Sequence, residues 1–407
     1  MLRFIQYLAE AKEGKNLHLE HLEDEVLNNG VEGTRAAINF LQSLRDMLAG
    51  NSKSSVNVTV KWDGAPAIFA GINPENDKFF VGTKGVFNVS PKVNYTNADI
   101  DANHSSAGLN DKLKVALKYL PKLGITDVLQ GDMLFTKEDL KTEKIDGKSY
   151  TTFQPNTILY AVPTDSSAKI LKAKMGIVWH TTYTGKKLED MKASFGASVS
   201  SLTKTSDVWF SDANYEDKSG TINFNKSETT TITGILSNAG KTFRKIDSNL
   251  LGMISQDEEL KILIKTYNNT KVRAGEKITN TKMHTAGLIA YVYDKKKKEV
   301  DKVKRAQNKE IKQQNMDRLI KHFRSNASKL VTIFNMQNLL VDAKDIIIRK
   351  LEKAKGITST FIKTDKGYKV TQPEGFVAID KLGKAVKLVD RLEFSQNNFN
   401  AAKAWSK

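Results

Sequence analysis

The chain has 407 residues, of which 40% are hydrophobic and 27% are charged, a composition typical of a globular protein with two or three domains. Its 63 Lys and Arg exceed its 46 Asp and Glu, and the resulting charge of +17 favours either a polyanionic partner or a merely basic surface. The absence of cysteine excludes disulfides, cysteine nucleophiles and thiolate zinc sites, and it fits a reducing, cytoplasmic location. The apolar stretch at the start of the chain, residues 1–8, is too short and too mixed with polar residues to be a signal peptide. Because no apolar run is long enough to span a bilayer either, no membrane partner is expected.

Residues 1–50 are predicted to form helices. Residues 18–27 have an acidic, amphipathic pattern, and Thr34 is expected to cap a second helix that ends at Leu48. The acidic residues of the first helix stand beside two histidines. This combination fits either a metal site or, as we expect, a solvated helix face.

Lys61 is expected where a strand ends and the chain turns. The β-branched residues of 56–60 alternate as in a strand, and Gly64 and Pro66 interrupt regular structure after it. A lysine in such a place can reach into a cleft and act as a nucleophile if its pKa is lowered. Residues 78–87 predict the return strand of a hairpin, which carries Lys84 and ends in a turn.

The next stretch alternates between a helix and strands. Residues 107–123 have helical spacing, and residues 127–135 form an apolar strand that contains Gly131 and Asp132. Two more strands are predicted at 157–162 and 175–185, the second of which contains Trp179. Residues 186–230 are polar, and loops or short strands are expected there.

From about residue 231 to 356 helical periodicity dominates. This part contains the most basic segment of the chain, which could grip a phosphate backbone or could be a solvated helix with interleaved acidic residues. We favour the first interpretation. It assigns nucleic-acid binding to Lys295, Lys296, Lys297, Lys298, Lys302, Lys304 and Arg305.

Strands return in residues 357–407. Glu374 and Gly375 precede one apolar strand, and Lys384 and Lys387 flank the next. A plain hairpin would explain the apolar residues but not the charged residues beside them.

The run Lys61-Trp62-Asp63-Gly64 resembles the first motif of the covalent nucleotidyltransferases, the family of ATP-dependent DNA and RNA ligases and mRNA capping enzymes. Similar elements follow in the family's order: Lys84-Gly85, Gly131-Asp132, the strand of Trp179, Glu374-Gly375, and the segment from Lys384 to Lys387. The chain departs from the family pattern at Lys84, where Arg is commoner. It departs again at Asp132, where Glu is usual and reaches one methylene further.

The resemblance implies a role for each of these residues. Lys61 would be the catalytic nucleophile, and Asp63, Gly64 and Lys84 would bind the nucleotide, although a surface lysine at a turn would explain Lys84 equally well. Asp132 would bind the ribose, and Glu374 would join it in holding a metal ion. Trp179 would stack on the purine, although an ordinary core position would explain it too, and Lys384 and Lys387 would face the triphosphate.

The fold implied is α+β: a ligase-type nucleotidyltransferase domain of antiparallel sheets with helices, to which N-terminal helices and a large helical insertion are added. The expected segments are 1–50 (N-terminal helices), 51–230 (first part of the nucleotidyltransferase domain), 231–356 (basic helical insertion) and 357–407 (last part of that domain). Only 20 residues follow Lys387, too few for the OB domain that DNA ligases and capping enzymes carry. This favours an RNA ligase or an atypical compact ligase, whereas the residues of the first motif, Lys-x-Asp-Gly, favour the other enzymes of the family.

The implied function is an ATP-dependent polynucleotide ligase that uses Mg²⁺ or Mn²⁺. It would join 5′-phosphate ends of DNA or RNA to 3′-hydroxyls through a lysyl-adenylate, and we expect it to act as a monomer. Two alternatives remain: a capping-type guanylyltransferase, and a basic nucleic-acid-binding protein without catalytic activity.

Overall fold

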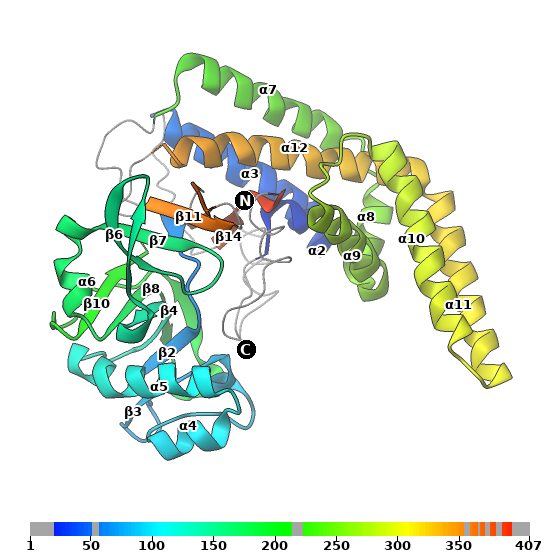
Figure 1. Ribbon diagram of the computed structural model, residues 1–407. Helices are drawn as coiled ribbons and strands as arrows, with labels where there is room; N and C mark the ends of the chain where they lie inside the picture. Colours follow the sequence, from blue (N-terminus) through cyan, green and yellow to red (C-terminus); the bar gives the residue numbers. More distant parts are fainter. Residues whose placement is uncertain are drawn as a thin grey trace.

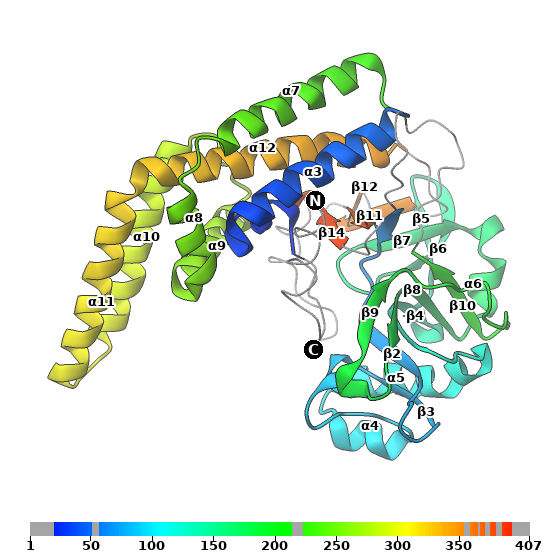
Figure 2. The ribbon, with the colours of Figure 1, turned by 180° about the vertical axis from the view of Figure 1, so that it is seen from behind.

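The computed structural model describes residues 20–50, 57–213, 223–353, 359–364, 367–370, 375–379 and 385–392. The long helices gather on one side of the protein and the sheets on the other (Figure 1), and the view from behind shows the same division (Figure 2). The protein is therefore α+β, as expected. Among the residues described, no helix combines the length and the apolar character that a bilayer crossing requires.

The helical side is one unit made from segments far apart in the sequence. The N-terminal helix α3 packs against α7, α8 and α12, and a continuous apolar core runs through these elements. The N-terminal helices and the helical insertion, which were expected as separate segments, thus share a core. Its helices are α2 (Glu25–Asn28), α3 (Gly30–Leu48), α7 (Lys226–Phe243), α8 (Ser248–Gln256), α9 (Glu258–Ala274), α10 (Thr281–Asp301), α11 (Ala306–Ser325) and α12 (Ala327–Leu351).

Helix α3 shows how the pattern of the sequence builds this unit. Leu41, Leu44 and Leu48 recur at spacings of three and four, and all three are buried in the shared core. The expected start of this helix is wrong, because α3 begins at Gly30. Thr34 lies one turn inside the helix, where its hydroxyl donates a hydrogen bond to the Gly30 carbonyl at 2.8 Å.

A six-stranded sheet forms the centre of the other side. Its main path runs β10-β8-β4-β2-β3, and β9 pairs with β8. All neighbours are antiparallel except β10 and β8. Helix α5 covers one face through Leu113 and Ala116. The elements are β2 (Ala67–Ile72), β3 (Phe79–Gly82), α4 (Asn97–Asn103), α5 (Ala107–Tyr119), β4 (Val128–Thr136), β8 (Met175–Thr184), β9 (Lys192–Phe195) and β10 (Val208–Asp212).

A five-stranded antiparallel sheet has the order β12-β11-β7-β6-β5. Its strands β11 and β12 follow the helical insertion in the chain, so the insertion leaves and re-enters the β side. The elements are β5 (Lys141–Ile145), β6 (Lys148–Phe153), β7 (Leu159–Pro163), α6 (Ala168–Lys172), β11 (Ser359–Thr364) and β12 (Gly367–Val370). Short 3-10 helices are η1 (Leu22–Asp24), η2 (Lys84–Phe87), η3 (Leu120–Leu123), η4 (Lys137–Asp139), η5 (Thr164–Ser166) and η6 (Leu188–Asp190).

The third sheet joins the two sides of the protein. It contains β1 (Asn57–Lys61), β13 (Gly375–Ile379) and β14 (Ala385–Leu388), paired antiparallel in the order β1-β13-β14. Val58, Phe376 and Leu388 project from one face into the core of the helical unit. Because side chains alternate along a strand, the other face of this sheet points away from the helices.

Candidate active site

Lys61 and Lys387 lie on the same face of the three-stranded sheet. Thr59 is opposite Val377 on β13, and Val377 is opposite Lys387 on β14. Directly opposed residues share a face, and Lys61 shares the face of Thr59 because it stands two residues further along β1. Both lysines therefore project from the face that turns away from the helical core, and both are half-buried.

The end of β1 is paired with the start of β13. Lys61 stands opposite Gly375, and a Cβ at Gly375 would lie 2.5 Å from the carbonyl oxygen of Leu388. Only glycine lets the three strands approach so closely at this point, and the φ of 142° found there is one that other residues rarely adopt. The segments around Lys61 and Lys387 thus meet although the sequence separates them widely.

The turn after Lys61 rests on β4 beside Asp132. A Cβ at Gly64 would lie 2.5 Å from the Cβ of Asp132. Two backbone hydrogen bonds hold the turn to the strand: the Ala65 amide donates to the Met133 carbonyl at 2.9 Å, and the Met133 amide donates to the Pro66 carbonyl at 3.1 Å. The first and third of the motif-like segments are therefore in direct contact.

Asp63 holds this turn from the other side. Its carboxylate accepts hydrogen bonds from the Asn156 side chain at 2.7 Å and from the amides of Thr157 and Ile158 at 2.7 and 2.8 Å. The Asp63 amide donates to the Tyr160 hydroxyl at 2.7 Å. Because the carboxylate is buried and its oxygens accept three donors of the chain, Asp63 positions the turn, and its expected contact with the nucleotide stays a prediction.

The six-stranded sheet carries Asp132 and His180 on one face. Nε2 of His180 lies 3.7 Å from Oδ2 of Asp132, and both side chains are partly open to solvent. Val389, just beyond β14, packs with Leu134 and Val178 of the same face. The segment of Lys387 is thereby brought against the face of the central sheet that carries Asp132.

Trp179 points the opposite way, so the expected stacking on a purine is corrected. Its side chain is fully buried in the cluster beneath α5, together with Ile177 and Leu129. A base could not reach the ring in this position. Of the two interpretations made for Trp179, the structure supports the core residue. His180, which received no role from the sequence, takes its place on the open face.

Three further expected site residues are not brought to this point by described contacts. Lys84 is exposed at the start of η2, just after the edge strand β3, and its role stays a prediction. Glu374 and Lys384 lie outside the described residues, immediately before β13 and β14 in the sequence.

The residues expected to hold a metal ion include one described carboxylate, that of Asp132. Among the described residues, no cluster of three or more His, Cys, Asp and Glu side chains could enclose a metal ion. Mg²⁺ in nucleotide sites, however, is commonly held by one or two carboxylates together with substrate phosphates. Asp132 fits this mode of binding, in which the nucleotide completes the coordination.

A buried ionic cluster lies behind the strand of Lys387. His21 forms a β-bridge with Lys387. Next to it, the Lys344 ammonium lies 2.8 Å from Glu23, and the Arg391 guanidinium lies 3.0 Å from Asp24. Glu23 and Asp24, which were expected on a solvated helix face, are therefore buried in ion pairs.

Burial and neighbouring charges shift the pKa values of Glu23 and His21 in this cluster. Burial alone would raise the pKa of Glu23, but the positive charges of Lys344 and Arg391 outweigh it and hold that pKa at about 2. Burial, helped by the neighbouring cations, keeps the pKa of His21 well below its usual value, so His21 is neutral. The cluster thus joins η1, α12 and the C-terminal strands as an ion-paired unit.

The basic residues predicted to bind nucleic acid lie at the far ends of α10 and α11. Lys297, Lys298, Lys302, Lys304 and Arg305 are exposed, and Lys295 lies over the ring of Tyr291. Lys296 is an exception, because it is largely buried and forms ion pairs with Glu259 at 2.8 Å and Glu299 at 3.2 Å. These contacts occupy its ammonium group and correct its expected role.

The comparisons with known proteins identify a family but no activity. The model of DUF6267, described as a family of unknown function, matches residues 16–403 of the chain. No curated protein and no solved structure matches the chain.

Proposed function

This chain belongs to the DUF6267 family, a family of unknown function, and we propose that it is an ATP-dependent polynucleotide ligase. Under this proposal residues 51–230 and 357–407 form a ligase-type nucleotidyltransferase domain, and the helices are an accessory unit. Lys61 takes AMP from ATP. The AMP then activates the 5′-phosphate of a DNA or RNA end, and a 3′-hydroxyl displaces it to seal the strand.

The observation that carries the proposal is the pairing of Lys61 with Gly375 across β1 and β13. These residues belong to two of the motif-like segments and stand near opposite ends of the chain. The contact of Gly64 with Asp132 adds a third segment, and the shared face of Lys61 and Lys387 adds a fourth. If the four short motifs were chance matches in the sequence, they would not be expected to meet around one lysine in the folded protein.

The chemistry of the first step fits the charges around Lys61. The amine nitrogen forms a bond to the α-phosphorus of ATP, the bond from that phosphorus to the bridging oxygen breaks, pyrophosphate leaves, and the amine releases its proton to water. A free lysine, with a pKa of about 10.4, is protonated at neutral pH. A neighbouring cation disfavours the protonated amine, and Lys387 supplies one on the same face.

The remaining groups serve binding and charge stabilisation. Asp132, and by the resemblance Glu374, would hold a divalent metal ion that neutralises the phosphate charge. Lys387 projects from the face that carries Lys61, where it can attract the triphosphate. His180 lies beside Asp132 on the open sheet face and can contact the nucleoside from there.

The test is the intact mass of the purified protein after incubation with each of the four nucleoside triphosphates and Mg²⁺. We expect the wild type to gain the mass of one AMP from ATP, and Lys61→Ala and Lys61→Arg to gain nothing. Lys78→Ala, which changes an exposed lysine of the same half of the chain, is the matched control and should label like the wild type.

The outcomes separate the proposal from its two alternatives. Labelling by GTP instead of ATP would point to a capping-type guanylyltransferase. An unchanged mass with all four nucleotides would refute covalent catalysis, and salt-dependent nucleic-acid binding without labelling would then indicate a non-catalytic binding protein.

A further inference from the structure

Helices α10 and α11 form an arm that projects away from the sheets. They run antiparallel and are joined by residues 302–305, and both views show the pair extending to the opposite end of the protein from the sheets (Figures 1 and 2). The 21 residues of α10 give it a length of about 30 Å. A ligand that touches both the end of the arm and the candidate active site must therefore be a long one.

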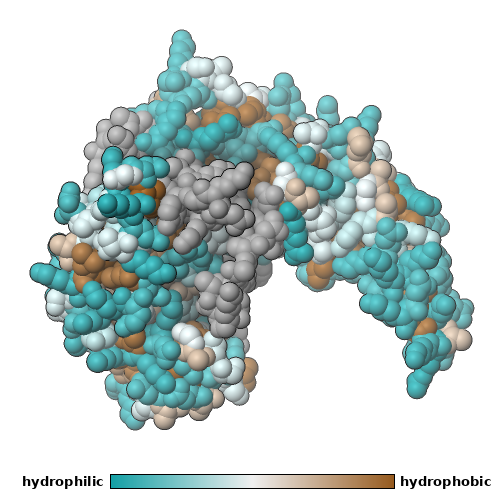
Figure 3. Space-filling model, in the orientation of Figure 1, coloured by the Kyte–Doolittle hydropathy of each residue, from teal (hydrophilic) through white to brown (hydrophobic). Residues whose placement is uncertain are grey.

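The arm concentrates the positive charge of the chain. Residues 281–325 contain 13 Lys and Arg but only 5 Asp and Glu, whereas the whole chain carries +17. Nearly half of the net charge is thus placed on about a tenth of the residues. Its surface is correspondingly hydrophilic in Figure 3.

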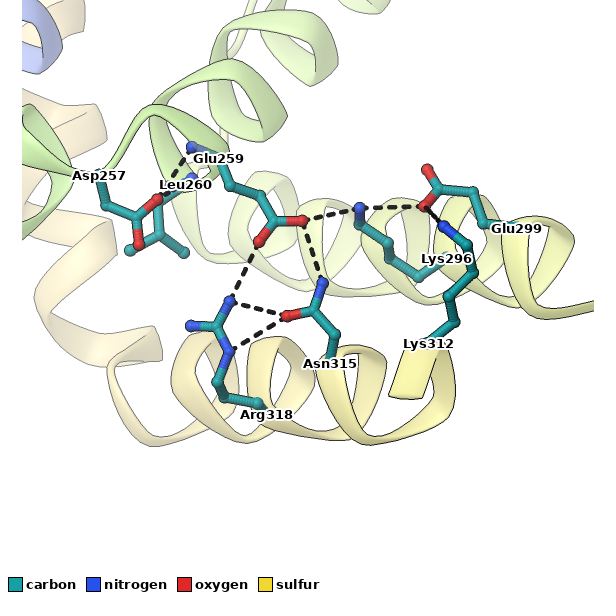
Figure 4. A network of polar contacts seen from close by, with 8 residues as sticks. All are labelled: Asp257, Glu259, Leu260, Lys296, Glu299, Lys312, Asn315 and Arg318. Carbon is teal, nitrogen blue, oxygen red and sulfur yellow. Dashed lines mark hydrogen bonds and ion pairs between the residues drawn. The ribbon is translucent and has the colours of Figure 1, made fainter. Parts of the chain in front are cut away.

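A network of charged side chains fixes the arm to α9 (Figure 4). Glu259, near the start of α9, pairs with Lys296 of α10 at 2.8 Å and with Arg318 of α11 at 3.0 Å. Asn315 also donates a hydrogen bond to Glu259 at 3.2 Å. One carboxylate therefore ties both helices of the arm to the rest of the protein and holds the arm in one direction.

The cations beyond this network point outward. Lys297, Lys298, Lys302, Lys304 and Arg305 are exposed, and within the described part of the chain none of them has a carboxylate within ion-pair distance. Lys296, their neighbour, has two such partners. The arm thus separates one lysine that holds its structure from five exposed cations that have no carboxylate partner, of which Lys297 also lies over the ring of Tyr293. We call these five residues the arm tip.

We propose that the arm tip binds the phosphodiester backbone of a polynucleotide at a distance from Lys61. A polymer with a negative charge at each repeat can reach both places, whereas a mononucleotide cannot. A membrane surface is a poorer match, because interfacial helices present a continuous apolar face and α10 directs Leu288, Val292 and Val300 inward. The identity of this polymer as the ligase substrate depends on the proposed function, but the binding itself does not.

Salt dependence measures the proposed contacts directly. Each phosphate neutralised on duplex DNA contributes about −0.9 to the slope of log K against log salt, and about −0.7 on a single strand. The first variant changes all five residues of the arm tip to Gln. The second changes five exposed lysines of the β side to Gln and so removes the same charge: Lys141, Lys144, Lys148, Lys169 and Lys172.

The probes are a nicked DNA duplex of roughly 30 base pairs, a matched RNA duplex and a single DNA strand. The arm-tip variant should have a slope shallower by at least about 2 on the probe that is bound, and the β-side variant should keep the wild-type slope. Lys298→Gln should make the salt slope shallower, whereas Lys296→Gln should leave it unchanged. The two variants thus distinguish a lysine that contacts the ligand from one that pairs with Glu259 and Glu299. Circular dichroism checks that each variant is folded.

Equal slopes for the wild type and the arm-tip variant on all three probes would overturn the inference, as would an equal loss in the β-side variant. Failure of the proposed function gives a different result. If the wild type never gains AMP from ATP but the salt slope of the arm-tip variant is still shallower than that of the wild type, the arm binds nucleic acid in a protein that is not a ligase. If adenylation persists in the arm-tip variant while the slopes are equal, only the inference about the arm fails.

Discussion

The ammonium of Lys344 lies 2.8 Å from Oε2 of Glu23, and both side chains are almost completely withdrawn from solvent. The pair joins α12 to η1, immediately behind the strand of Lys387. Removing one member of such a pair leaves a buried charge without compensation, which typically costs about 3–5 kcal/mol. We expect Lys344→Met to lower the free energy of unfolding by about this amount, as measured by urea denaturation.

The double variant Glu23→Gln with Lys344→Met removes both charges and should recover most of the loss. Lys329→Met serves as the control. It breaks an ion pair with Asp247 of similar length, 2.7 Å, that lies on the surface, so its effect on the free energy of unfolding should be far smaller. If Lys344→Met were as mild as Lys329→Met, the cluster would not be the ionic link between the helical unit and the C-terminal strands.

Asp345, next to Lys344 on α12, should weaken the fold at neutral pH. Burial raises the pKa of Asp345 from 3.8 to about 6, and Asp390 and Glu23 add to the rise against the opposing charge of Lys344. The native state therefore holds this proton more tightly than the unfolded state does. Stability is lost as the pH rises from about 4 to about 6, and the loss persists above that range.

Asp345→Asn should consequently stabilise the protein at pH 7.5 by about 1–2 kcal/mol and leave it unchanged near pH 3.8. The measurement is urea unfolding of the variant and the wild type at both pH values. Asp342→Asn is the matched control, because the Asp342 side chain on the same helix is partly open to solvent and pairs with Lys277 at 3.1 Å. A gain of equal size at both pH values would contradict the assigned ionisation.

Much of the secondary structure could be predicted from the sequence, because periodicity is a local property. The strand before Lys61 is confirmed, and so is the helical character of the described residues 231–353. The burial of Glu23 could not be predicted, since its partner Lys344 stands 321 positions away and nothing near Glu23 in the chain indicates it. A run of acidic residues looks the same in the sequence whether water or a distant lysine surrounds it.

Trp179 and His180 show the same limit within the candidate site. The period of a strand requires that these neighbours face opposite ways. Which of the two faces is covered depends on where α5 packs, and this is decided by tertiary contacts. The sequence therefore indicated the strand correctly, but it could not show that Trp179 faces the core and His180 the open face.

One variant of each residue tests whether Trp179 serves the core and His180 the open face. Trp179→Phe should lower the free energy of unfolding by about 1–3 kcal/mol, because it removes buried surface from the core, and should leave the apparent ATP affinity in the adenylation assay unchanged. His180→Ala should change stability by less than about 0.5 kcal/mol and weaken the apparent ATP affinity. Weaker ATP use by Trp179→Phe with normal stability would instead support the stacking role that the sequence suggested.

Gly64 provides the sharpest test of the contact between the turn after Lys61 and the strand of Asp132. A methyl group at this position would lie 2.5 Å from the Cβ of Asp132 and 3.0 Å from the Met133 carbonyl oxygen, so the turn or the strand must shift. Overpacking of this kind costs about 1–3 kcal/mol. Displacing the turn would also misplace Lys61, and misplacement of a reacting group by about 1 Å can reduce a rate roughly 100-fold.

We therefore expect Gly64→Ala to fold with reduced stability and to lose between about 10-fold and 100-fold in the rate of adenylation, a loss larger than its stability at the assay temperature explains. Gly108→Ala is the control, because a Cβ there meets nothing within 4 Å and the residue lies in the first turn of α5. That change should stabilise the protein by about 0.5–1 kcal/mol and leave adenylation intact. If Gly64→Ala adenylated at the wild-type rate, the close approach of the turn to Asp132 would have no part in positioning Lys61, and the convergence of the motif-like segments would lose its functional meaning.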